Sequence, residues 1–102
     1  IAQPACTRCG DCCAGCNVGA KNTVALTYLP DAARHGADMF TEITVRHIAK
    51  SQDGSWRVHA APTGGKGGEI ILEAAIVVLA AGTLGSTEIL MRSREQGLAV
   101  SD

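Results

Sequence analysis

The side chains best suited to bind a metal are cysteines, which cluster near the start of the chain. Five of them lie within the first sixteen residues. Four have the spacing with which bacterial ferredoxins hold an iron–sulfur cluster, although Asn17 stands where a proline usually follows. Four thiolates on a flexible loop would also satisfy a zinc ion. The predicted ligands of an iron–sulfur cluster or zinc ion are Cys6, Cys9, Cys12 and Cys16, with Cys13 as an extra thiol.

Disulfides and simple packing of the thiols are the two alternatives to a metal site. The cysteines could form disulfides or simply pack, and an odd number leaves at least one thiol unpaired in any intramolecular scheme. Clustered cysteines fit a metal site in a reducing cytosol and disulfides in an export pathway. The sequence therefore leaves both the chemistry and the compartment open.

A second candidate site is the turn Ala80-Ala81-Gly82-Thr83-Leu84-Gly85. It follows an apolar run and precedes a helical pattern, which is the setting of a dinucleotide-binding turn with its first glycine replaced by alanine. Glycine lets a backbone approach a pyrophosphate closely, and the free N–H groups of a helix start attract its negative charge. A plain strand-to-helix turn has the same spacing, so both interpretations stand.

Other functions are poorly supported by the residues. The chain has 102 residues, a net charge of −1 and only 19% charged residues, so it has no basic stripe for nucleic acid. Its longest apolar run is far shorter than a transmembrane segment requires. His35, His47 and His59 are dispersed, and no nucleophile, base and acid can be assembled around them. We therefore assign no catalytic residue.

The elements that must position these sites follow from the apolar pattern. Four segments are expected: a Cys-rich loop over 1–21, a helix over 22–36 interrupted near Pro30, a three-stranded antiparallel β-meander over 38–73, and a strand-turn-helix unit over 74–97. The strand of the last unit, Ala74 to Ala81, is almost wholly apolar, which is typical of a strand covered on both faces in a parallel sheet. The fold class is therefore α/β.

Several short motifs together resemble the glucose-methanol-choline (GMC) family of FAD-dependent oxidoreductases, in its cholesterol-oxidase-like branch. These motifs are Gly19-Ala20-Lys21-Asn22-Thr23, Thr27-Tyr28-Leu29, Asp53-Gly54, Gly82-Thr83-Leu84-Gly85-Ser86-Thr87-Glu88 and Arg92-Ser93-Arg94. The resemblance implies an internal part of one Rossmann-like FAD-binding domain. The missing N- and C-terminal parts of the same chain would supply the remaining FAD site and the catalytic residues.

The resemblance also implies roles for particular residues. The backbone at Val45 would meet the adenine of FAD, while Ala81 and Gly82 would pass near its phosphate and ribose portion. The implied reaction is oxidation of the CH–OH group of a small-molecule alcohol or sterol, with FAD accepting the hydride. The segment by itself is expected to be inactive.

Overall fold

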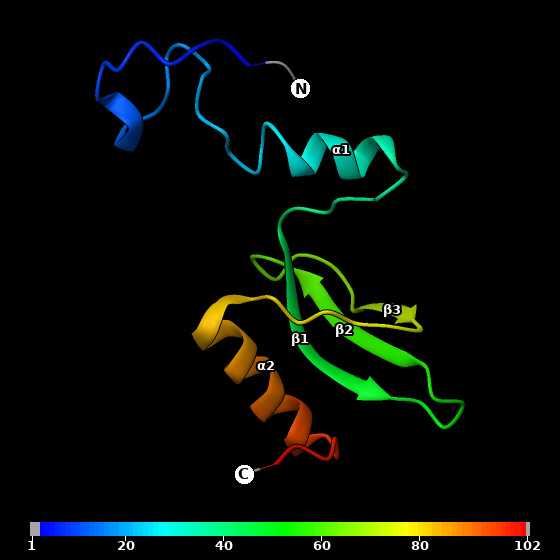
Figure 1. Ribbon diagram of the computed structural model, residues 1–102. Coiled ribbons are helices and arrows are strands. Elements are labelled where there is room, and N and C mark those ends of the chain that lie inside the picture. The colour runs from blue at the N-terminus through cyan, green and yellow to red at the C-terminus, as the bar shows by residue number, and fades with distance from the viewer. Residues whose placement is uncertain (1–2, 102) are drawn as a thin grey trace. The chain divides into compact units, whose positions relative to one another are not determined.

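The computed structural model of the protein describes residues 3–101. The chain divides into two compact units, one running to Met39 and one starting at Phe40. The first unit contains a 3-10 helix at Asp11–Cys13 and the helix α1 at Tyr28–Arg34. The second contains strands β1 (Ile43–Lys50), β2 (Trp56–Pro62) and β3 (Ile70–Ala74), followed by helix α2 (Gly82–Glu95) (Figure 1).

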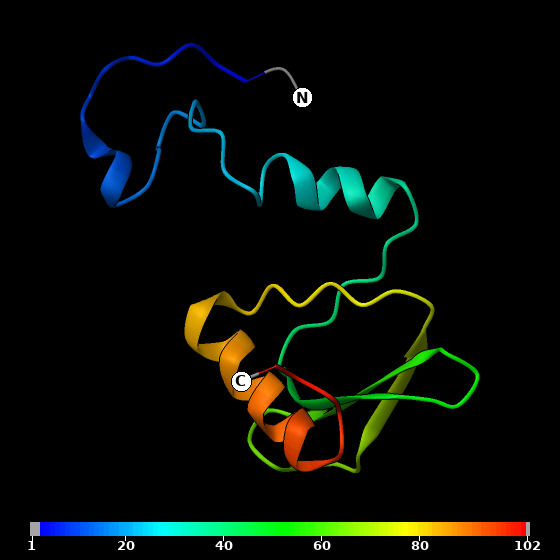
Figure 2. The same cartoon turned by 60° about the horizontal axis from the view of Figure 1, so that its bottom comes forward.

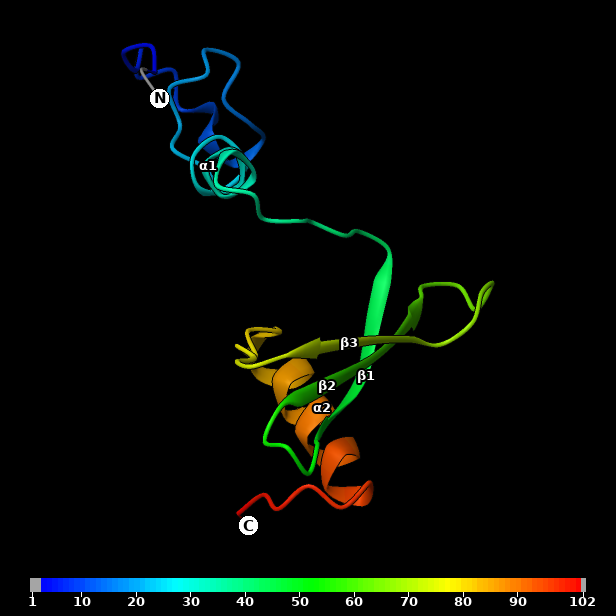
Figure 3. The same ribbon diagram turned by 90° about the vertical axis from the view of Figure 1, so that its right-hand side faces the viewer.

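The second unit is built on an antiparallel sheet whose strand order is β1-β2-β3. This confirms the predicted three-stranded meander, whose consecutive strands are visible in Figure 3. The β1–β2 connection is the predicted Asp53-Gly54 turn, in which the Asp53 carboxylate accepts hydrogen bonds from the backbone N–H and the hydroxyl of Ser55. These bonds, with the positive φ of Gly54, fix the tight reversal that alternating strands require.

Helix α2 packs beside β1, which is an edge strand of the sheet. The apolar core between them is small, with Ile48, Ala60 and Ile89 as its buried hydrophobic side chains. Ser93 is completely buried in the same place, and its hydroxyl is hydrogen-bonded. Few side chains therefore hold the helix against the sheet, and each of them carries a large share of the packing.

Helix α1 is shorter than the expected span of 22–36. It begins at Tyr28, so that Pro30 lies in its first turn, where a missing N–H costs no hydrogen bond. The residues before it form turns, with the Thr27 hydroxyl donating to the carbonyl of Thr23 at 2.8 Å. None of residues 3–39 is buried, so no apolar core fixes the first unit.

The strand expected over Ala74 to Ala81 does not form among the described residues. After β3 the chain continues as a connecting segment to α2, seen in yellow in Figure 2. Val77 and Leu79 are half-buried, whereas Ile76 and Val78 are 80% and 83% exposed. A parallel strand needs neighbouring strands of its own sheet, and residues 3–101 provide none. Over the same range, no helix has the length and apolar character needed to cross a bilayer.

Candidate functional site

A cleft of about 570 Å³ lies between the start of β1, the connecting segment and α2. Its walls bring Val45, predicted to meet adenine, together with Ala81 from the predicted phosphate turn. Gly82 follows Ala81 directly as the first residue of α2. The remaining wall residues are Ile43, Thr44, Val78, Leu79, Ala80, Gly85, Glu88, Ile89 and Arg92. Two stretches that are far apart in the sequence thus form one concave surface with a largely apolar lining.

An irregularity in β1 turns Val45 toward this cleft. Val45 pairs with Ala60 and His47 with His59, so Arg46 is an extra residue in β1 and forms a β-bulge. Because side chains alternate across a strand, Val45 and Ile48 would otherwise point to opposite faces. The bulge places both on the face that carries the buried Ala60 and packs against α2. The sequence does carry a sign of this extra residue, because the apolar alternation of Ile43 and Val45 breaks before Ile48, three positions later.

The turn at the start of α2 has features that suit a dinucleotide. Gly82 has a φ of 73°, a left-handed conformation that other residues adopt only with strain, and nothing lies within 4 Å of where its Cβ would be. At Gly85 an added Cβ would lie 3.3 Å from the Cβ of Ala81, so glycine permits a close approach there. The backbone at Gly82 is therefore open to close approach, as a turn that binds a pyrophosphate requires.

Sequence reasoning missed the two side chains that fasten α2 to β1. The Ser93 hydroxyl accepts from the N–H of Ile48 at 2.9 Å and donates to the carbonyl of Ile89 at 2.7 Å. The Arg92 guanidinium donates to the carbonyl of Arg46 at 3.1 Å and pairs with the carboxylate of Glu88. The Arg92-Ser93-Arg94 motif was recognised in the sequence, but nothing in its spacing revealed these contacts.

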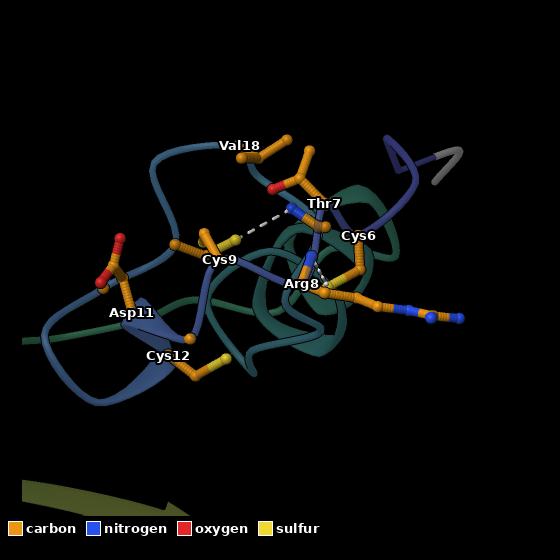
Figure 4. Close-up of a pocket in the computed structure, with 11 residues that line it drawn as sticks. Cys6, Thr7, Arg8, Cys9, Asp11, Cys12 and Val18 are labelled. Atoms are coloured by element: carbon orange, nitrogen blue, oxygen red, sulfur yellow. Dashed lines mark hydrogen bonds between the residues drawn. The ribbon is translucent and has the colours of Figure 1, made fainter.

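The cysteine loop forms a separate pocket of about 200 Å³ in the first unit, shown in Figure 4. The four predicted ligands, Cys6, Cys9, Cys12 and Cys16, all line it, whereas Cys13 does not. All five thiols are free. Among residues 3–101, however, no three side chains of His, Cys, Asp or Glu are arranged to hold a metal ion. As folded here, the loop does not present a formed metal centre, and the metal assignment stays a prediction.

Cys16 differs from the other thiols of the loop in its surroundings. It is half-buried, and its sulfur accepts a hydrogen bond from the N–H of Ala20 at 3.3 Å. That bond, followed by one from the N–H of Lys21, lowers the pKa of the Cys16 thiol because both stabilise the thiolate. The thiolate of Cys16 is therefore favoured, and the thiolate is the form that binds a metal or reacts.

Two of the three histidines lie side by side in the sheet. His47 and His59 stack across β1 and β2 with ring centroids 4.1 Å apart, and His59 contacts Glu69 at 2.9 Å. Partial burial lowers the pKa of His47, the nearby His59 lowers it further, and Glu69 acts in the opposite direction. His35 lies in the other unit at the end of α1.

Comparison with known protein families identifies the family of the chain. The sequence model of the GMC oxidoreductase family matches residues 2–97, and the chain belongs to that family. No solved structure matches it significantly.

Among curated relatives, a cholesterol oxidase of Mycobacterium tuberculosis is 37% identical over 98 residues, covering 94% of this chain and 17% of the relative. A long-chain-alcohol oxidase, FAO4B, of Arabidopsis thaliana is 36% identical over 95 residues, covering 83% of this chain and 13% of the relative. A cholesterol oxidase of Acinetobacter baumannii is 31% identical over 115 residues, covering 90% of this chain and 18% of the relative. The chain thus spans less than a fifth of the length of these relatives.

Proposed function

We propose that this segment is the internal part of an FAD-binding domain in an oxidoreductase that acts on the CH–OH group of an alcohol or sterol. The cleft that gathers Val45 and Ala81 carries the proposal, because it unites two regions assigned separately to the same cofactor. In this proposal Val45 meets the adenine, and Ala81 and Gly82 lie along the phosphate and ribose portion. When bound, FAD supplies the hydride acceptor.

The exposed face of the segment before α2 supports a larger sheet around this site. Val77 and Leu79 pack inward while Ile76 and Val78 are bare, which is the alternation of an extended strand with one face covered. We propose that further strands and helices of a longer chain pair with this segment and cover it, which completes a Rossmann-like parallel sheet. Apolar side chains left so exposed are typical of a surface that another element covers.

The cofactor assignment is tested by filling the cleft in the full-length protein. Val45→Trp places a large ring in the cleft, and Val24→Trp makes the same change at a side chain that is 59% exposed in the first unit. We expect the wild type and Val24→Trp to purify with flavin absorbance, and Val45→Trp to have lost most of it while its far-ultraviolet circular dichroism is retained. Full flavin content in Val45→Trp would contradict the assignment.

The reaction is tested separately with two substrate classes. The relatives are named as cholesterol oxidases and a long-chain-alcohol oxidase, so a sterol and a long-chain alcohol are the two classes to compare. Anaerobic mixing of the flavin-loaded protein with a 3-hydroxysterol or with a long-chain primary alcohol should bleach the flavin with one class. If neither class reduces the flavin, the proposed activity is wrong even if FAD binds.

A second function is favoured by the cysteine pocket. Its lining includes the four cysteines with ferredoxin-like spacing and leaves out Cys13, so a metal site would require the loop to rearrange until these four sulfurs meet at one centre. None of residues 3–39 is buried, so core packing does not oppose that rearrangement. Iron and zinc analysis of anaerobically purified full-length protein tests this function. Metal that is lost in Cys16→Ser and kept in Cys13→Ser would support it, and protein free of both metals would contradict it.

A further inference from the structure

Two side-chain hydrogen bonds join α2 to β1 at the bulge in β1 and just after it. Arg92 reaches the carbonyl of Arg46, which is the extra residue of the bulge, and Ser93 receives the N–H of Ile48 two residues later. Both groups belong to the outer edge of an edge strand, where no other strand pairs with them in residues 3–101. Arg92 and Ser93 of α2 therefore make the hydrogen bonds that a neighbouring strand would otherwise make to this part of β1.

The bulge is the feature that turns Val45 into the cleft. A bulged residue leaves the regular ladder, so its backbone groups need other partners if the irregularity is to persist. Ser93 has no exposed surface, so water cannot take the place of its hydroxyl. The Arg92 guanidinium is itself oriented by its ion pair with Glu88, one turn earlier on α2.

We infer that Arg92 and Ser93 are positioning residues that hold the β1 bulge and thereby set Val45 at the adenine end of the cofactor cleft. This inference rests on the proposed FAD site. Ser93 has no exposed surface and so cannot touch the cofactor, whereas Arg92 also lines the cleft. Their effect is on the end of the cleft formed by β1, whereas the flavin ring would be bound elsewhere.

The test measures which half of the cofactor is affected in the full-length apoprotein. Dissociation constants are measured for FAD and for two probes of its halves, ADP and FMN. We expect Ser93→Ala to weaken the binding of FAD and ADP by about tenfold, which is the effect of one lost buried hydrogen bond. The affinity for FMN should be unchanged. Thr87→Val is the matched control, because the Thr87 hydroxyl makes the same bond to a carbonyl one turn earlier without reaching β1.

A second pair of variants keeps the inference testable if Ser93→Ala does not fold. Arg92→Met removes the donor to Arg46 at a side chain that is 35% exposed, and Arg92→Lys restores a donor. Because Arg92 also lines the cleft, these variants are compared with adenosine, which has no phosphate for the side-chain charge to attract. Loss of adenosine affinity in Arg92→Met with recovery in Arg92→Lys would support the positioning role, and unchanged adenosine affinity would contradict it.

The possible failures can be told apart. Equal losses for ADP and FMN would overturn the inference, because general loosening would then explain the effect. Unchanged FAD affinity in every variant would overturn it while leaving the FAD site intact. A wild-type protein that binds no FAD would overturn the proposed function itself.

Discussion

Two glycines in the first turn of α2 should respond in opposite ways to the same substitution. Gly82 has a left-handed backbone with φ of 73°, and its missing Cβ faces open space. Gly85 has no such φ, and its Cβ would meet only the Cβ of Ala81 at 3.3 Å. Alanine at Gly82 is thus opposed by backbone conformation, whereas alanine at Gly85 is opposed by one tight contact.

These geometries give different free energies of unfolding for the protein without cofactor. Gly82→Ala should lower that free energy by about 1–2 kcal/mol, the cost of a left-handed alanine. Gly85→Ala should lie between no change and a gain of about 1 kcal/mol, because alanine favours the helix and the contact with Ala81 offsets part of the gain.

Adding FAD should widen the difference in free energy of unfolding between Gly82→Ala and the wild type, because the cofactor is proposed to pass through the open space at Gly82. At a free FAD concentration of about 100 times the dissociation constant, the wild type gains about 2.7 kcal/mol of stability. A tenfold weaker site in Gly82→Ala would lose about 1.4 kcal/mol of that gain.

Urea unfolding of the full-length protein with and without FAD measures both effects. If Gly85→Ala loses as much stability as Gly82→Ala without FAD, the left-handed backbone is not the cause. If Gly82→Ala gains as much from FAD as the wild type, the cofactor does not approach Gly82.

Three further results are expected. Burial lowers the pKa of His47 below its ordinary value of about 6.5, so the unfolded chain takes up the proton first as the pH drops. The free energy of unfolding should therefore fall between about pH 7 and about pH 5. Urea titrations of His47→Phe should show a smaller fall. The lowered pKa of the Cys16 thiol should make iodoacetamide modify Cys16 ahead of Cys13 at mildly acidic pH, as read by mass spectrometry, and equal rates would contradict this. Ile89→Ala should lower the free energy of unfolding by about 2–5 kcal/mol, because Ile89 is one of the few buried side chains between α2 and β1. A loss of less than about 1 kcal/mol in urea unfolding would contradict the importance of this core.

Local signals predicted the meander well. Alternating side chains and the Asp53-Gly54 turn determine neighbouring strands through contacts that are close in sequence. The start of α1 was less predictable, because the turn before Tyr28 has helix-like apolar spacing while Pro30 fits only the first turn.

Features that depend on distant parts of the chain could not be predicted from such signals. The carbonyl of Arg46 in the β1 bulge accepts a hydrogen bond from Arg92, which is 46 positions away. Ser93 lies between two arginines in the sequence, which is typical of a solvated helix face, and yet it is the most buried of residues 3–101. The segment after β3 was expected as a buried strand, but the strands that would pair with it are not among residues 3–101. At the candidate site, family resemblance supplied Val45 and Ala81, and the structure brought them into one cleft.

The central claim is tested most directly by photolabelling the full-length apoprotein with FAD that carries a photoreactive azide on its adenine. Peptides are then mapped by mass spectrometry, with unmodified FAD as competitor. The proposed site predicts that the label is attached at the start of β1, around Val45, and disappears when FAD competes. A competed label found only in other peptides, with β1 unmodified, would contradict the assignment of this cleft to the adenine of FAD.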